Sequence, residues 1–226
     1  MKMDNVIAKL KHGLIVSCQA DKSSPLYGPV FMSAMAKAAE IGGAVGIRAN
    51  GPDDIKAIKS AVNLVIIGIN KSQIAGYPVY ITPTLELARE VAEAGADIIA
   101  CDATLRERPI PFKELVKMIH NELGLKVMAD ISTLEEGLRA QEDGADLLAT
   151  TLSGYTPYSR KLKGPDIMLI KELANKVTIP VIGEGRFRYP WQVGLAIKAG
   201  AYAIVVGNAI TNPISLTRWF CQYLPK

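Results

Sequence analysis

Lys71 lies just beyond an apolar, largely β-branched segment, residues 64–69. Such a segment is typical of a parallel β-strand that is buried on both faces. In α/β barrels and open α/β sheets, the chemistry takes place at the carboxyl ends of the strands. We therefore predict that Lys71 is a catalytic acid/base and that the other strands place their polar residues around it.

Glu184 is the second catalytic candidate, because it leaves a predicted strand centred on Val181 and Ile182. A lysine with an ordinary pKa of about 10.4 is a poor base at neutral pH, so burial or a cation such as Arg48 must lower that pKa. A nearby carboxylate acts in the opposite direction. The same lysine could instead form a Schiff base with a carbonyl substrate, and the residue pattern leaves both chemistries open.

Each predicted strand ends in a polar residue, and in a closed barrel these residues would meet at one mouth. A single polar residue after a strand is usually only solvated or caps a helix. Eight polar residues, each at the carboxyl end of a predicted strand, indicate a site, although about half of them are expected to cap helices or hold loops. The eight are Gln19, Arg48, Lys71, Asp102, Asp130, Thr151, Glu184 and Asn208.

Glycine-containing turns follow the last two predicted strands, at residues 183–185 and 207–209. Loops at these positions in barrels commonly bind phosphate, because exposed backbone N–H groups and a helix N-terminus favour an anion. The alternative is that these glycines merely turn the chain. The predicted phosphate-binding residues are Gly185, Arg186, Gly207 and Asn208, with Arg188 as a further source of charge.

The elements that position these residues alternate between strands and helices. Strands are predicted at 14–18, 44–47, 64–69, 98–101, 126–129, 147–150, 181–182 and 203–206, with a small extra strand at 79–81. Helices are predicted at 29–41, 52–61, 84–94, 112–123, 133–143, 166–176, 190–199 and 214–223, after a short helix within 1–10. Gly-Ala pairs at 43, 95, 144 and 200 recur roughly every 50 residues, or every two βα units. The pattern predicts one (β/α)8 barrel domain over 1–226; an open doubly wound sheet fits less well, because no Gly-x-Gly-x-x-Gly follows the first strand.

The composition excludes several classes of function. Apolar residues make up 49% and charged residues 21% of the 226 residues, as in an ordinary soluble enzyme. The net charge of +4 suits an anionic small molecule, but no basic cluster follows a nucleic-acid backbone. No apolar run approaches the roughly 20 residues that span a bilayer, and no apolar signal core follows the amino-terminal segment. We expect a cytoplasmic protein with no nucleic-acid or membrane partner.

The residues that most often bind metals show no suitable spacing. Three cysteines, Cys18, Cys101 and Cys221, are widely separated and indicate neither a disulfide framework nor a metal site. Asp102 and Asp130 also lack metal-ligand spacing. We therefore predict no required metal.

Seven short motifs follow one another along the chain: GLIVSCQ at 13–19, GIRAN at 46–50, GINK at 68–71, DAT at 102–104, MADI at 128–131, TTLSGY at 150–155 and GEG at 183–185. In this order they resemble the N-acetylmannosamine-6-phosphate 2-epimerase family. The resemblance implies a ribulose-phosphate-binding (β/α)8 barrel that interconverts N-acetylmannosamine 6-phosphate and N-acetylglucosamine 6-phosphate in sialic-acid catabolism, without a cofactor. It makes Lys71 and Glu184 the catalytic pair. It also implies that Gln19, Arg48 and Asp130 contact the substrate.

The chain departs from this family pattern in two places. Residues 211–213 read Thr-Asn-Pro where the family usually has Thr-Arg-Pro with the arginine on the phosphate, and residues 72–74 read Ser-Gln-Ile in place of Arg-Asp-Tyr. Asn212 carries no charge, and losing a charge-assisted hydrogen bond costs roughly 1.5–3 kcal/mol. Arg186, Arg188 or Lys161 could replace it. The alternative functions are a Schiff-base lyase or synthase acting through Lys71, and a phosphosugar-binding barrel without activity.

The last predicted helix carries an apolar face that packs either on its own barrel or on a second copy of the chain. We expect a homo-oligomer, with a dimer favoured. The face comprises Ile214, Leu216, Trp219, Phe220 and Tyr223.

Overall fold

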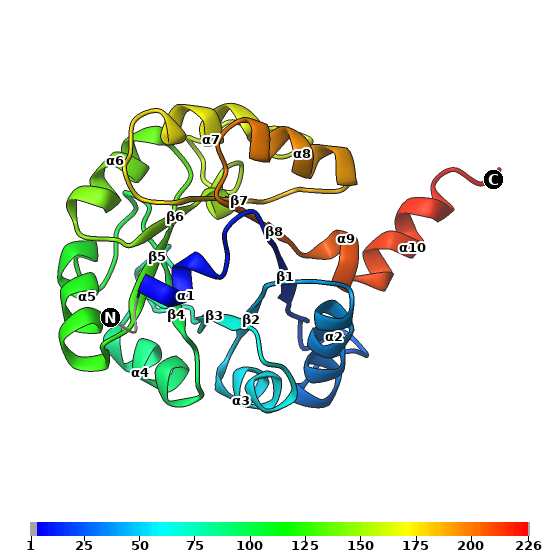
Figure 1. Ribbon diagram of the computed structural model, residues 1–226, viewed down its shortest axis with the longest axis horizontal. Coiled ribbons are helices and arrows are strands. Elements are labelled where there is room, and N and C mark those ends of the chain that lie inside the picture. Colours follow the sequence, from blue (N-terminus) through cyan, green and yellow to red (C-terminus); the bar gives the residue numbers. More distant parts are fainter. Residues whose placement is uncertain (1–3, 226) are drawn as a thin grey trace.

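Eight parallel strands close into a barrel in the computed structural model, which describes residues 4–225 (Figure 1). Each strand pairs with the next in sequence, and β8 pairs with β1 to complete the ring. The predicted (β/α)8 barrel is therefore confirmed. The strands are β1 (Leu14–Cys18), β2 (Gly46–Asn50), β3 (Val65–Ile69), β4 (Ile98–Asp102), β5 (Lys126–Asp130), β6 (Leu147–Ala149), β7 (Val181–Glu184) and β8 (Ala203–Val206).

Helices surround the ring of strands (Figure 1). Prolines occupy the first turns of four of them, where a missing N–H costs nothing. Thr84 caps the helix that follows β3, and Thr133 with Glu136 forms a capping box at the start of the helix that follows β5. The helices are α1 (Asp4–Ala8), α2 (Pro29–Ile41), α3 (Pro52–Ala61), α4 (Leu85–Glu93), α5 (Phe112–Met118), α6 (Leu134–Glu142), α7 (Ile167–Ala174), α8 (Pro190–Lys198), α9 (Asn208–Thr211) and α10 (Pro213–Cys221).

Successive strand residues point alternately into the barrel and out towards the helices, which gives two apolar clusters. In β3, Ile67 packs inside the barrel and Ile66 packs beneath the helices. The predicted amino-terminal helix is confirmed as α1, and the fully buried Leu10 that follows it joins the inner cluster. Residues 1–3 of that predicted segment lie outside the described part. The amino end of the barrel is thereby closed by apolar side chains, and the carboxyl end is left for polar ones.

Some predicted boundaries differ from the structure. Residues 79–81 do not form a strand; Ile81 makes a single antiparallel bridge to Lys71. Both edges of β3 are already paired, with β2 and β4, so an added segment can pair only with residues beyond the end of β3. The sixth strand stops at Ala149 because the chain turns into a short 3-10 helix. The helix from residue 112 continues beyond α5 as a π-helix, Ile119–Leu123.

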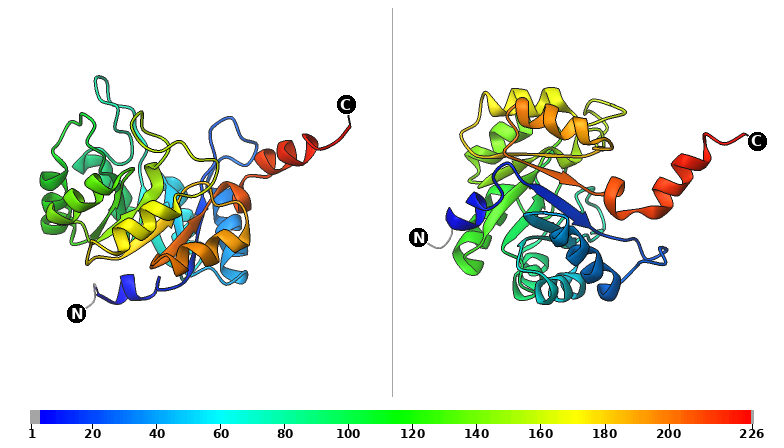
Figure 2. Two further views of the ribbon diagram at one scale, coloured as in Figure 1. Left: turned by 90° about the horizontal axis from the view of Figure 1, so that it is seen from above. Right: turned by 45° about the vertical axis from the view of Figure 1, so that its right-hand side comes forward.

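The carboxyl-terminal helix leaves the barrel. Figure 2 shows α10 extending away from the ring of strands, and within the described residues none of its side chains is buried. In a (β/α)8 barrel the helix after the last strand normally joins the outer ring. Only part of the predicted apolar face therefore contacts its own barrel: Trp219 packs against Arg188 and Tyr189, whereas Phe220 and Tyr223 are exposed. Within residues 4–225, no helix is long and apolar enough to cross a membrane.

Candidate active site

An open cavity of about 1060 Å³ lies at the carboxyl ends of the strands. It contains most of the residues that the sequence singled out, delivered by six different strands and the turns after them. Asp130 is one exception, because it is fully buried and lies against Arg48 at the side of the cavity. The predicted residues that line the cavity are Gln19, Arg48, Lys71, Thr151, Glu184, Gly185, Arg186, Gly207 and Asn208.

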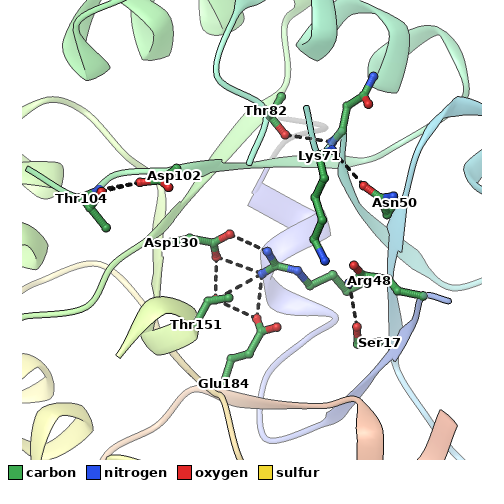
Figure 3. Close-up of polar contacts among 12 residues, drawn as sticks. Ser17, Arg48, Asn50, Lys71, Thr82, Asp102, Thr104, Asp130, Thr151 and Glu184 are labelled. Carbon is green, nitrogen blue, oxygen red and sulfur yellow. Dashed lines mark hydrogen bonds and ion pairs between the residues drawn. The ribbon is translucent and has the colours of Figure 1, made fainter. Parts of the chain in front are cut away.

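Arg48 contacts both carboxylates of the site, Asp130 and Glu184 (Figure 3). Its side chain is 1% exposed and forms a two-pronged ion pair with Asp130, with Nη1 donating to Oδ1 at 2.9 Å. The same Nη1 donates to Glu184 Oε2 at 2.7 Å. The Thr151 hydroxyl lies 2.7 Å from Asp130 Oδ1 and 3.0 Å from Glu184 Oε2. One guanidinium thus holds two carboxylates from different strands in a defined arrangement.

The position of Glu184 is also set through its backbone. Its N–H donates to Thr150 Oγ1 at 3.0 Å, and that hydroxyl donates to the Glu184 carbonyl oxygen at 2.9 Å. The strand end of β7 is thereby tied to the turn after β6. The carboxylate therefore projects from a fixed backbone into the cavity.

Lys71 is anchored through its backbone and extends into the cavity. Its N–H donates to Asn50 Oδ1 at 2.9 Å, and it forms the bridge with Ile81. Figure 3 shows the side chain directed towards Arg48. The side chain is exposed to the cavity, and the atoms around it still desolvate its amine. The amine is therefore accessible to a ligand while remaining partly desolvated.

The environment moves the pKa values of Lys71 and Glu184 towards each other. Burial, assisted by the Arg48 charge, lowers the pKa of the Lys71 amine below its ordinary value, against the opposing effects of Glu184 and Asp130. Burial also raises the pKa of the Glu184 carboxyl above its ordinary value, although Arg48 acts against this. An amine that loses its proton more easily now faces a carboxyl that keeps its proton more easily. Such a pair is suited to proton transfer near neutral pH.

Gln19 offers an unused acceptor at the cavity wall. Its Nε2 donates to Ser17 Oγ at 2.8 Å, which orients the amide. Its Oε1 is buried without a hydrogen-bond partner among the described residues. An unpaired buried acceptor is costly, so a donor group on a ligand would be favoured there.

Arg186 and Lys161 both donate hydrogen bonds to the backbone of the loop after β6. The Arg186 guanidinium donates to the carbonyl oxygens of Gly164, at 2.8 Å, and of Ser153, so it ties down the loop after β6. Lys161 Nζ donates to two carbonyl oxygens of the same loop, the nearer at 2.6 Å, and does not line the cavity. Lys161 is therefore not placed to replace the family's phosphate-binding arginine.

Asp102 is one of the strand-tip residues that hold a loop, as was expected for about half of the eight. Its carboxylate accepts from the Thr104 hydroxyl at 2.6 Å and pairs with Arg106 at 2.6 Å. It does not line the cavity. Asp102 instead organises the loop between β4 and α5.

Among the cavity-lining residues that were not identified from the sequence as site residues are Asn50, Tyr80 and Arg218. Asn50 ends β2 two positions after Arg48, so strand alternation indicates that both side chains point inward. Tyr80 lies beside the bridge between Lys71 and Ile81, which depends on a long-range pairing. Arg218 lies on α10, and no local pattern shows which side of that helix meets the barrel.

The chain is similar in sequence and in structure to known N-acetylmannosamine-6-phosphate 2-epimerases. Residues 32–226 match the family described as "Putative N-acetylmannosamine-6-phosphate epimerase". A protein named as a putative N-acetylmannosamine-6-phosphate 2-epimerase in Caldanaerobacter subterraneus subsp. tengcongensis is 53% identical over all of this chain and 96% of its own length. The solved structure of the N-acetylmannosamine-6-phosphate 2-epimerase from Clostridium perfringens superposes with a TM-score of 0.94 at 46% identity, over 96% of each chain.

A more distant solved structure, thiamine phosphate pyrophosphorylase from Pyrococcus furiosus, has a TM-score of 0.65 at 18% identity, over 95% of this chain and 93% of its own. At that identity the likeness concerns the fold alone. The family match and the close relatives, by contrast, extend over nearly the whole chain. This protein belongs to the N-acetylmannosamine-6-phosphate 2-epimerase family.

Proposed function

We propose that this protein interconverts N-acetylmannosamine 6-phosphate and N-acetylglucosamine 6-phosphate by removing and returning the proton at C2, in the catabolism of amino sugars such as sialic acid. The names of its relatives supply the substrate pair. The observation that carries the proposal is the presence, in one cavity, of an amine with a lowered pKa and a carboxyl with a raised pKa. Epimerisation requires such groups, because a proton must leave one face of the carbon and return to the other.

The chemistry follows from the position of C2 beside a carbonyl carbon in the open-chain sugar. The neutral Lys71 amine takes the C2 proton, and the electron pair of the broken C–H bond forms a C1–C2 double bond as the carbonyl oxygen becomes an enolate. A proton added to the opposite face of C2 gives the epimer. Arg48 supplies permanent positive charge beside the cavity, which favours the enolate. Glu184 is the acid/base group for the second proton.

The remaining residues bind and orient. Gln19 Oε1 is the acceptor for an N–H or hydroxyl of the sugar, and Thr151 lies close enough to Glu184 to contact the same substrate. The Gly185 and Gly207 backbone holds the phosphate at the β7 and β8 end of the cavity. Asp130 acts through Arg48, because its carboxylate is fully buried against that guanidinium.

The direct test is an assay of the purified protein with each of the two hexosamine 6-phosphates in D2O. We expect each substrate to give the other, with deuterium at C2 of the product by NMR. Conversion without solvent deuterium would contradict the proposed proton exchange. Tight binding without turnover would indicate a non-catalytic barrel, and a borohydride-trapped adduct on Lys71 would indicate a Schiff-base lyase or synthase.

We also propose that the protein lies in the cytoplasm, where its three free cysteines are expected to stay reduced. We further propose that it is a homodimer joined through α10. The outer side of α10, with Leu216 and Phe220, lines an apolar groove together with Leu224. In the described part of the chain, no helix occupies the place between α2 and α8 where a barrel's eighth helix normally packs. The exposed apolar residues on α2 and α8, spaced as one face of each helix, are Phe31, Ala34, Ala38, Ile41, Trp191 and Leu195. Reciprocal insertion of α10 would cover both sets of apolar side chains.

Phe220→Asp is expected to convert the dimer into a monomer. Phe220 is 67% exposed on one chain, and a carboxylate in an apolar interface without a partner is strongly unfavourable. We expect the dimer dissociation constant to rise at least about a hundredfold, measured by sedimentation equilibrium. Met168→Asp, an equally drastic change at an exposed apolar residue on α7, is the matched control and should leave the mass unchanged. A monomeric wild-type protein would refute the proposal.

A further inference from the structure

We infer that the phosphate group of the substrate is bound by Arg218, a residue of the projecting helix α10, with Arg188 beside it. The inference rests on the proposed function, because it names the cations that recognise the phosphorylated end of the same substrate. A phosphate monoester is close to a dianion at neutral pH and is bound most strongly by arginines, whose N–H groups can make two parallel hydrogen bonds. The cations that line the cavity are Arg48, Lys71, Arg186, Arg188 and Arg218.

Three of these cations are already engaged elsewhere. Arg48 is buried and occupied by two carboxylates. Lys71 lies beside it, where the proton transfer takes place. Arg186 donates to two backbone carbonyl oxygens and stacks on the Tyr155 ring at 5.4 Å, so moving it would release the loop after β6.

Arg218 is available. Within the described residues, its guanidinium makes no hydrogen bond and no ion pair, and it lines the cavity. It shares one side of α10 with Ser215 and Gln222, since residues three and four positions apart lie on the same helix face. This face continues the wall formed by Gly207 and Asn208 at the end of β8. The free positive charge therefore lies at the same end as the predicted phosphate loops.

Asn212 carries no charge, and its amide is used to begin α10. Its Oδ1 accepts from the Ser215 N–H at 3.0 Å, and its Nδ2 lies 3.3 Å from Asn208 Oδ1. An asparagine in this capping role stabilises the first turn of the helix that carries Arg218. The charge that the family usually places at this position is thus found six residues later on the same helix.

Aromatic contacts hold the cavity face of α10 in place. The Arg188 guanidinium lies 3.7 Å from the centre of the Trp219 ring, and Tyr189 meets the same ring edge-on at 5.9 Å. A stacked arginine keeps its N–H groups free at the edge of the guanidinium plane. Arg188 therefore adds a second positive charge and joins α10 to the chain segment before α8.

The test is Arg218→Gln in the full chain, with Arg218→Lys as the conservative variant and Arg89→Gln as the control. Arg89 is an exposed arginine paired with Glu122 and does not line the cavity. Two quantities are measured: the affinity for inorganic phosphate by titration calorimetry, and the steady-state constants for the phosphorylated and the unphosphorylated N-acetylhexosamine. Thermal unfolding of each variant establishes that it is folded.

Arg218→Gln should weaken phosphate binding and raise KM for the phosphorylated sugar by about tenfold to a hundredfold, with kcat changed less than about threefold. Turnover of the unphosphorylated sugar should be unaffected, and Arg218→Lys should recover part of the loss. Phosphate affinity within twofold of the wild type in Arg218→Gln would overturn the inference. If the wild type binds phosphate but does not epimerise, the phosphate arm still tests Arg218, and the proposed function alone has failed.

Discussion

Lys71→Ala is expected to abolish epimerisation, with a fall in kcat of about a thousandfold or more. General acid–base groups typically contribute between a hundredfold and ten-thousandfold, and no other amine among the described residues lines the cavity. Solvent deuterium should no longer enter C2 of either sugar, because the group that exchanges the C2 proton is missing. The measurement is the rate of deuterium incorporation by NMR, alongside kcat.

The fold should survive this substitution, because Lys71 is held through its backbone and its side chain forms no hydrogen bond within the described residues. The melting temperature of Lys71→Ala should therefore stay close to that of the wild type. Lys56→Ala, at an exposed lysine of α3, is the matched control and should leave kcat unchanged. A Lys71→Ala enzyme that still works within about tenfold of the wild-type rate would show that another group moves the C2 proton.

Arg48→Met is expected to lower the free energy of unfolding by about 3–5 kcal/mol and to eliminate activity. The substitution retains much of the side-chain volume but leaves Asp130 and Glu184 without their shared cation, and a buried charge without its partner costs about this much. Denaturant unfolding measures the loss. Arg89→Met, which breaks an exposed ion pair with Glu122, should cost no more than about 1 kcal/mol.

The penalty in Arg48→Met should depend on pH in a definite direction. The pKa of Glu184 is already raised by burial, and removing the Arg48 charge removes an influence that lowers it. A carboxyl whose pKa is higher in the folded than in the unfolded state stabilises the fold at low pH, and this contribution disappears as the pH rises through the folded-state pKa. The loss of stability should therefore be smaller at about pH 5 than at about pH 8. A penalty that grows towards low pH would contradict this account.

Short segments of the sequence determine the strands of the barrel and the residues at their ends. The apolar segments, many of them β-branched, predicted all eight strands of the barrel. The helices between them were indicated by proline and threonine at helix starts and by repeated Gly-Ala pairs at helix ends. Strand ends also predicted that Arg48, Lys71 and Glu184 face one cavity, because parallel strands in a closed ring end at the same mouth. These features depend on the periodicity of short segments, and a single chain displays that directly.

Only the tertiary structure decided which polar residues pair with each other. Arg48 meets Asp130 and Glu184 from 82 and 136 residues away, whereas Asp102, in the same phase, turns to Arg106 on its own loop. The departure of α10 from the barrel was equally undetermined, because an amphipathic helix shows that it has an apolar face but not what covers it. Strand periodicity sets the direction of a side chain, but its partner depends on the closure of the whole ring, which no local stretch of sequence contains.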